Sequence, residues 1–191
     1  PSYHGASYTA AVGDGLAYII KARVQLLRDL GWAIAPNSAW LLIQGIETLS
    51  LRIERHVQNA QDVAEWLENH PDVASVNYSG LPASPWYAAA NKYAPKGVGA
   101  VLSFELKGGV DAGRALVENL DLFSHLANIG DVRSLVIHPA STTHSQLSPE
   151  AQLSAGVTPG LVRLSLGIEN VEDLKADLEA GFAAARKVVA E

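Results

Sequence analysis

An arginine lies in the middle of an apolar segment that has the period of a β-strand. In GLVRLSLGIE, residues 160–169, the apolar side chains at positions 162, 164 and 166 point to one face and Arg163 points to the other. A guanidinium held rigidly in this way can form two parallel hydrogen bonds with a carboxylate. The alternative interpretation is an arginine on a solvated sheet face, and the spacing is compatible with both.

The segment NIGD, residues 128–131, can supply further groups for the same chemistry. It lies between two expected strands, and Ser134 follows it closely. A glycine in such a turn commonly adopts a positive φ, so the glycine alone is weak evidence of function. Asn128, however, can offer a side-chain amide and a loop N–H to a carboxylate that Arg163 also binds. We therefore expect Asn128 and Arg163 to lie at one anion-binding site.

The densest polar cluster is HPASTTH, residues 138–144. Its two histidines are six positions apart across a proline, so a metal site would need a third ligand from elsewhere. A Ser-His-Asp triad can be written from Ser141, His144 and Asp131, but the chain has no GxSxG motif around a nucleophile. We favour a structural role, in which Pro139 forces an extended chain and the following hydroxyl groups bond to the loop backbone.

A nucleophilic lysine is not expected in this sequence. Such a lysine needs a desolvated site, whereas the lysines here fall on predicted helix surfaces, loops or strand ends beside polar or charged neighbours. In those positions their usual role is solubility. They are Lys21, Lys92, Lys96, Lys107, Lys175 and Lys187.

The composition argues against several classes of protein. The chain has 191 residues, of which 48% are hydrophobic, enough for one domain or one domain with an extension. A net charge of −6 and thinly spread basic residues argue against nucleic-acid binding. The lack of cysteine excludes disulfides and thiolate metal sites, and no apolar run approaches the roughly 20 residues of a membrane span. The N-terminus lacks the pattern of a signal peptide, and because it begins with Pro1 we expect a part of a longer protein.

Two helices are expected in the N-terminal third of the chain. Asp14 can cap the first, whose apolar positions recur at three- and four-residue steps as far as Leu30, and Gly31 can end it. Asn37 can cap the second, in which apolar residues keep a spacing near 3.5 until Pro71. At ~1.5 Å per residue this helix would be about 45 Å long, which suits a connection between two domains or two subunits.

Short strands and helices alternate from Asp72 onward. Strands are expected around Arg163 and at residues 73–78, 98–106, 122–126 and 133–138. Helices are expected to begin at Ser84, to cover residues 110–120 and 148–155, and to follow a cap at Asn170. This order predicts an α+β fold, a sheet with helices on one side.

Two long motifs resemble those of a known enzyme family. SHLANIGDVRSLVIHPASTTHSQLS and GVTPGLVRLSLGIENVEDL are similar to the C-terminal part of pyridoxal-phosphate (PLP) enzymes of the Cys/Met metabolism class. Within this class, SHLANIGD, KARVQLLRDLG and QGIETLSLRIERH most resemble the O-acetylhomoserine sulfhydrylase branch. The motifs occur in the family's order and cover almost the whole chain.

The resemblance implies a fold-type I transferase, in which a large domain holds the cofactor and a small C-terminal domain closes over the substrate. Residues 1–36 would be a remnant of the large domain and a linker, residues 37–71 a long connecting helix, and residues 72–191 the substrate-clamping α+β domain. Its sheet would be rich in antiparallel pairs and covered by helices on one face. The resemblance also implies a cytoplasmic homotetramer. Without the large domain, the first 40 residues and one side of the long helix would expose apolar surface.

The resemblance assigns roles to individual residues. The arginine of the family's RLSxGxE motif, here Arg163, binds the α-carboxylate of the amino-acid substrate, and the residue that opens the xxGD turn, here Asn128, binds it as well. Because other branches often have serine at that position, Asn128 can act through its side chain or only through its backbone N–H. Thr143 and His144 of the HPAxxTH motif and the nearby Ser134 are supporting residues.

The implied reaction converts O-acetyl-L-homoserine and sulfide to L-homocysteine and acetate with PLP, in methionine biosynthesis. The family's Schiff-base lysine and other cofactor ligands belong to sequence before Pro1, so we expect these 191 residues alone to be inactive and not to bind PLP. Neighbouring branches are alternatives: cystathionine γ-synthase, cystathionine γ-lyase and O-succinylhomoserine sulfhydrylase. A further alternative is a non-catalytic module that binds a small anion or mediates subunit contacts.

Overall fold

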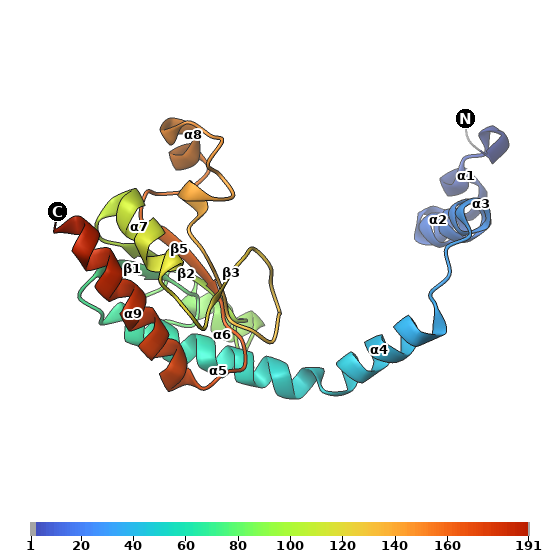
Figure 1. Cartoon of the computed structure of the whole chain (residues 1–191). Helices are drawn as coiled ribbons and strands as arrows, with labels where there is room; N and C mark the ends of the chain where they lie inside the picture. The colour runs from blue at the N-terminus through green and yellow to red at the C-terminus, as the bar shows by residue number, and fades with distance from the viewer. Residues whose placement is uncertain (1–2, 191) are drawn as a thin grey trace. The chain divides into compact units, whose positions relative to one another are not determined.

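The structure is a computed structural model that describes residues 3–190. The chain divides into two compact units, Pro1–Glu47 and Thr48–Glu191. Figure 1 follows the chain through both units by its colours. Among the helices in the described part, none combines the length and the hydropathy needed to cross a membrane.

The described part of the first unit is helical. Its elements are η1 (Tyr3–Gly5), α1 (Tyr8–Val12), α2 (Asp14–Lys21), η2 (Ala22–Leu27), α3 (Arg28–Leu30) and α4 (Pro36–Glu47). α2, the π-helical η2 and α3 follow one another without a gap and cover the predicted first helix. Gly31 ends it in the left-handed conformation, with φ 66°, as predicted. The N-cap is Gly13 and not Asp14, which lies in the first turn, where its charge favours the helix dipole.

The first unit leaves most of its apolar side chains exposed. Ala17 is the one buried hydrophobic residue among the unit's described residues. Tyr18, Trp32 and Ile46 are 83%, 62% and 66% exposed. The apolar surface predicted for the N-terminal part of the chain is therefore present.

The prediction of one continuous helix over residues 37–71 is wrong. α4 ends at Glu47, α5 (Leu49–Glu68) begins after it, and Thr48 between them has φ −105° and ψ 6°. Threonine favours cap positions over helix interiors, and Gly45 lowers the helix propensity just before the break. Asn37 is likewise not a cap, because α4 already begins at Pro36.

A five-stranded sheet forms the centre of the second unit. The strands are β1 (Val73–Asn77), β2 (Val101–Leu106), β3 (Ser124–His125), β4 (Leu135–Ile137) and β5 (Leu161–Ser165). They lie in the order β1-β2-β5-β4-β3, and only the β3–β4 pair is parallel. The register places Arg163 of β5 opposite Ser103 of β2 and Ile137 of β4. The sheet is thus mostly antiparallel, with Arg163 near its middle.

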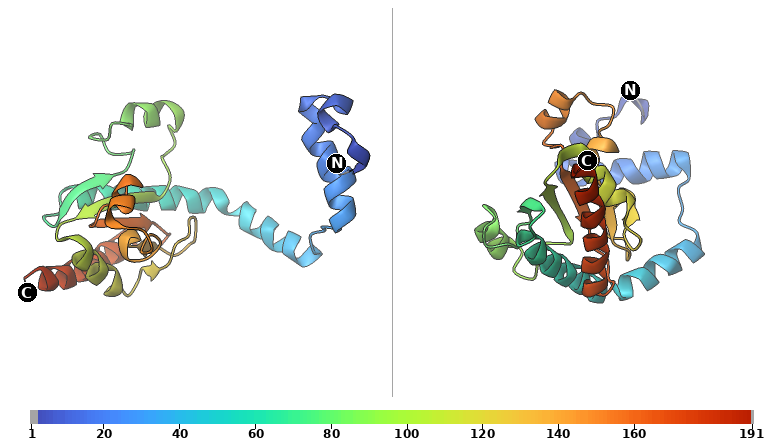
Figure 2. Two further views of the ribbon diagram at one scale, coloured as in Figure 1. Left: turned by 90° about the horizontal axis from the view of Figure 1, so that it is seen from above. Right: turned by 60° about the vertical axis from the view of Figure 1, so that its left-hand side comes forward.

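Three helices, α5, α7 (Gly109–Glu118) and α9 (Val171–Val189), build one core with the sheet (Figure 1 and Figure 2). The even-numbered residues of β2 and β5 enter this core, and Phe104, Leu164 and Phe182 are fully buried in it. Arg163 belongs to the odd-numbered set, so it lies on the sheet face opposite these helices. The alternation read from the sequence therefore predicts the correct face for Arg163, and the mixed α/β architecture agrees with the predicted fold class.

The remaining elements of the second unit are shorter than predicted or slightly shifted. α6 spans Tyr87–Tyr93 and so begins three residues after Ser84, η3 spans Pro139–Ser141, and α8 spans Pro149–Ser154. The predicted cap at Asn170 is confirmed, because its side chain accepts a hydrogen bond from the Glu172 N–H. Capping thus fixes where α9 starts, directly after the segment that follows β5.

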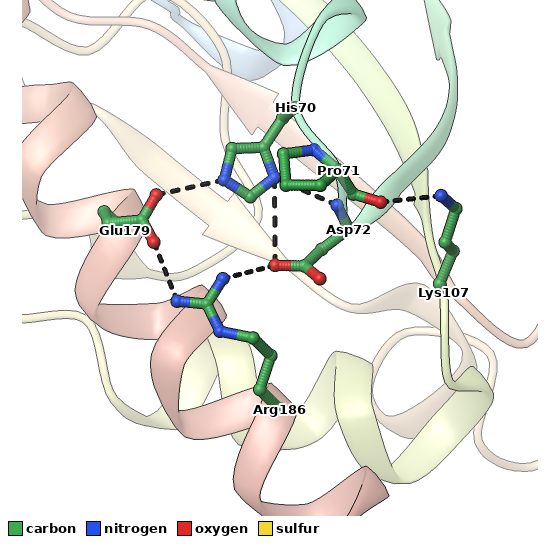
Figure 3. A network of polar contacts seen from close by, with 6 residues as sticks. All are labelled: His70, Pro71, Asp72, Lys107, Glu179 and Arg186. Carbon is green, nitrogen blue, oxygen red and sulfur yellow. Dashed lines mark hydrogen bonds and ion pairs between the residues drawn. The ribbon is translucent and has the colours of Figure 1, made fainter.

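A polar network joins the C-terminal end of α5 to α9 (Figure 3). The His70 ring stacks on Phe182 with a centroid distance of 4.0 Å, and its Nε2 lies 3.0 Å from a carboxylate oxygen of Glu179. Arg186 donates to Glu179 at 2.8 Å and to Asp72 at 2.5 Å. The hydrogen bonds that Glu179 accepts lower its pKa, and the one from Arg186 has a larger effect than the one from His70. The network therefore links the end of α5 to α9 at the edge of the core.

Candidate functional site

Arg163 and Asn128 contact each other, although 35 positions separate them in the chain. Arg163 is half-buried at the centre of β5, and its Nη2 donates to the backbone carbonyl of Asn128 at 3.3 Å. The Asn128 side chain turns back on its own loop, where Oδ1 accepts from the Ile129 N–H at 2.9 Å. The contact with Arg163 therefore uses the Asn128 carbonyl. That the Asn128 amide or N–H binds a carboxylate stays a prediction.

An open pocket of about 540 Å³ lies against the Arg163 face of the sheet. Arg163 and Leu161 line it from β5, Val101 and Ser103 from β2, and residues 155–157 from the loop before β5. Among the described residues that line the pocket, Arg163 is the only arginine or lysine, and none is an aspartate or glutamate. Arg163 also forms no ion pair with a described carboxylate. An unbalanced cation on a half-buried wall suits an anionic ligand.

Thr143 and His144 line the same pocket from the HPASTTH loop. The Thr143 hydroxyl lies 2.9 Å from Nδ1 of His144 and so orients the imidazole. The backbone of His144 is held on both sides, because its N–H donates to the Pro139 carbonyl and its carbonyl accepts from Gln152. The structure thus brings Thr143, His144 and Arg163 together around one pocket.

Ser134 does not line this pocket. It is fully buried, its hydroxyl donates to Glu169 at 2.9 Å, and the same oxygen accepts from the Gly167 N–H at 2.8 Å. The Ser134 N–H donates to the other carboxylate oxygen of Glu169 at 2.7 Å. Ser134 and Glu169 therefore form a pair beside the site. The sequence gives Glu169 no role of its own, although it is the last residue of the RLSxGxE motif that contains Arg163.

The HPASTTH loop itself has the structural role that the sequence favours. Both ring nitrogens of the buried His138 are engaged, since Nε2 donates to the Pro159 carbonyl at 2.8 Å and Nδ1 lies 2.8 Å from the Ser141 hydroxyl. Burial lowers the pKa of His138. Thr142 bonds to the His138 carbonyl, and Asp131 accepts from the Arg133 N–H instead of a histidine. The triad of Ser141, His144 and Asp131 is thus not assembled.

The pocket does not offer what a Schiff-base cofactor or a metal ion requires. None of the lysines lines it; Lys107 donates to the Pro71 carbonyl and Lys175 pairs with Glu172. Across residues 3–190, no group of three or more His, Cys, Asp or Glu side chains could hold a metal. The side chains present fit a carboxylate ligand and do not fit PLP itself, which needs a lysine amine and a phosphate site.

Comparisons with known proteins identify the family of the chain. The family model of the Cys/Met metabolism PLP-dependent enzymes matches residues 9–183. O-acetyl-L-homoserine sulfhydrylase 1 of Thermus thermophilus is 57% identical over 183 residues, which cover 96% of this chain and 43% of that protein. The chain thus spans less than half the length of this relative.

Solved structures give the same result. A Campylobacter jejuni chain assigned as O-acetylhomoserine (thiol)-lyase, which carries N'-pyridoxyl-lysine-5'-monophosphate, superimposes with a TM-score of 0.81 at 44% identity, covering 96% of this chain and 43% of that one. Cystathionine gamma synthase of Xanthomonas oryzae pv. oryzae, in complex with cystathionine, superimposes with a TM-score of 0.73 at 43% identity, covering 83% of this chain and 41% of that one. From the matched motifs and from both comparisons, the chain belongs to the Cys/Met metabolism PLP-dependent enzyme family.

Proposed function

We propose that this chain is the substrate-binding C-terminal part of an O-acetylhomoserine sulfhydrylase. The complete enzyme would convert O-acetyl-L-homoserine and sulfide to L-homocysteine and acetate in methionine biosynthesis. The observation that carries the proposal is Arg163, a cation that pairs with no described carboxylate, in a pocket to whose lining the residues 3–190 contribute no aspartate or glutamate. The 57% identity to the Thermus thermophilus sulfhydrylase supports the choice of substrate.

In this proposal Arg163 binds the α-carboxylate of the amino acid. One of its N–H groups is directed to the Asn128 carbonyl, which restrains the guanidinium plane and leaves the other donors for the ligand. The sheet holds the arginine at the register position between Ser103 and Ile137. A carboxylate bound in this way is fixed in orientation as well as in position. Thr143 and His144 bound the ligand on the loop side.

The cofactor belongs to the part of the enzyme that these residues do not supply. When bound, PLP acts as the electron sink for bond breaking at the substrate's α-carbon. Because the pocket has no lysine, we propose that residues 1–191 by themselves neither bind PLP nor catalyse the reaction. The second unit from residue 72 onward would be the small, substrate-clamping domain of a fold-type I transferase. Residues 1–36 would be a remnant of its large domain, and the complete enzyme a cytoplasmic homotetramer.

Substitution of Arg163 in the full-length enzyme tests this proposal. A charge-assisted hydrogen bond contributes about 2 kcal/mol, a factor of ~30 in affinity. We expect Arg163→Lys to raise the KM for O-acetyl-L-homoserine at least tenfold, because an ammonium keeps the charge but lacks the two parallel N–H donors of a guanidinium. Arg163→Ala should raise the KM further. Homocysteine formation from sulfide is the assay. Arg114→Ala is the control, since Arg114 is exposed on α7 and lies outside the pocket. Unchanged kinetics in both Arg163 variants would remove the assignment.

A second candidate is a cystathionine γ-synthase, favoured by the 43% identity to the Xanthomonas oryzae enzyme. Both candidates bind an amino-acid carboxylate, so Arg163 does not separate them. Parallel assays with sulfide and with L-cysteine, each with the acetyl and the succinyl ester of homoserine, do separate them. We expect the highest kcat/KM with sulfide and the acetyl ester, and faster turnover of cysteine would favour the second candidate. If the full-length protein turns over no ester in any of these assays, both enzyme assignments fail and the non-catalytic alternative remains.

A further inference from the structure

Arg163, which would bind the carboxylate, and the Asn128 carbonyl, which restrains its guanidinium, lie on separate segments whose spacing needs a support. Arg163 is on β5, and Asn128 is in the turn that precedes β4. Both segments continue toward the same place: Ile168 donates its N–H to the Val132 carbonyl at 3.0 Å, and Gly167 donates to the Ser134 hydroxyl at 2.8 Å. The chain after Arg163 and the chain after Asn128 therefore meet a few residues beyond the site.

The Glu169 carboxylate closes this meeting point. One oxygen accepts from the Ser134 N–H at 2.7 Å and the other from the Ser134 hydroxyl at 2.9 Å. The backbones approach so closely that a Cβ on Gly167 would lie 2.4 Å from the Val132 carbonyl oxygen and 2.3 Å from the Glu169 carboxylate. Only glycine fits there, so the two segments touch directly.

Helix α5 holds the same segment from its other side. The fully buried Asn59 donates to the carbonyls of Gly167 and Glu169 at 3.0 and 2.9 Å. Nδ1 of the buried His56 donates to the Leu166 carbonyl. Residues 166–169 are thus hydrogen-bonded to α5, and the Glu169 side chain in turn hydrogen-bonds Ser134, so the position of Ser134 depends on that of residues 166–169.

We propose that Glu169, acting through Ser134, is a positioning residue that sets the spacing between Arg163 and the Asn128 turn. Neither residue lines the pocket, so each acts on the ligand only through that spacing. The inference rests on the proposed function, since it names what aligns the carboxylate site. Its consequence is specific: loosening the pair should weaken binding of the carboxylate and leave binding of the rest of the ligand intact.

The experiment uses the full-length enzyme and a matched pair of competitive inhibitors. L-Norleucine carries an amino group, an aliphatic chain and a carboxylate, and n-pentylamine is the same molecule without the carboxylate. We expect Glu169→Ala to raise the inhibition constant of L-norleucine about tenfold or more, as a small misplacement of binding groups does, and that of n-pentylamine less than about twofold. Glu169→Gln keeps an acceptor for the Ser134 N–H and should restore most of the L-norleucine affinity.

A double variant measures the coupling. Once Arg163→Lys has removed the two parallel hydrogen bonds of the guanidinium, Glu169→Ala should lower the affinity for L-norleucine little further, because the two changes act on one interaction. Additive losses, or equal losses for both inhibitors, would overturn the inference. If Glu169→Ala does not fold, Ser134→Ala removes only the hydroxyl and should show the same selectivity with a smaller effect.

Asp177→Ala is the matched control. The Asp177 carboxylate also holds backbone N–H groups, those of Asp121, Leu122 and Phe123, at 2.9 to 3.0 Å, but it lies on α9 away from the pocket. We expect it to lower the melting temperature without changing the ratio of the two inhibition constants. If the Arg163 variants leave L-norleucine binding unchanged, the proposed function itself fails. If Arg163 matters and Glu169→Ala does not, only this inference fails.

Discussion

Replacement of Gly113 by alanine sets helix propensity against packing within α7. Gly113 is in the interior of this helix and is buried. In an open helix interior the change from glycine to alanine stabilises by about 1 kcal/mol. Propensity alone therefore predicts a more stable protein.

Packing predicts instead that Gly113→Ala destabilises the protein. A Cβ on Gly113 would lie 2.4 Å from Nε2 and 2.5 Å from Cδ2 of His138. The ring cannot yield freely, because Nε2 donates to the Pro159 carbonyl and Nδ1 is bonded to the Ser141 hydroxyl. Overpacking costs about 1–3 kcal/mol, and a buried donor left without its acceptor costs another ~1–3 kcal/mol. After subtracting the propensity gain, we expect a net loss of about 1–5 kcal/mol.

Thermal unfolding followed by circular dichroism measures the sign directly. For a chain of this size each kcal/mol shifts the melting temperature by roughly 2–4 °C, so Gly113→Ala should lower it by several degrees. Gly45→Ala is the control, because a Cβ at Gly45 in α4 meets no described atom within 4 Å apart from its chain neighbours and the adjacent backbone of its own helix. It should leave the melting temperature unchanged or raise it. A higher melting temperature for Gly113→Ala would refute the close contact between α7 and His138.

Two further predictions concern the same core. Burial lowers the pKa of His138 below the usual value of about 6.5 and so favours the neutral imidazole. The contribution of the neutral ring to stability is present above pH ~6.5 and is lost as the pH falls from there toward the folded-state pKa. The reason is that the unfolded chain then binds a proton that the native state does not. Urea unfolding between pH 7.5 and 5 should therefore show a smaller loss of stability for His138→Gln than for the parent protein, and equal slopes would contradict the neutral state. Phe182→Ala should cost about 3–5 kcal/mol, because the ring is fully buried between His70 and Phe104, and Phe182→Leu should cost less; a loss below 1 kcal/mol for the alanine variant in the same urea titration would mean that α9 does not pack as described.

Local patterns were sufficient for several elements. The period-two alternation around Arg163 predicts which face of β5 is buried, and Asn170 and Gly31 predict the start of α9 and the end of α3. Such signals depend on the preferences of a few adjacent residues, which act wherever the segment lies. The helix break at Thr48 escaped the same reading, because the apolar spacing is similar on both sides of it.

The sequence by itself determined the family, through long motifs, and the face from which Arg163 can reach a ligand. Only the tertiary structure decided what surrounds that arginine: the Asn128 carbonyl, the pocket wall formed by Thr143 and His144, and the support of Ser134 by Glu169. The partners in the two hydrogen-bonded pairs are 35 positions apart. They meet because strand register and close backbone approach bring their segments together. Side-chain periodicity gives the buried face of each segment, but it does not say which distant segment lies beside it.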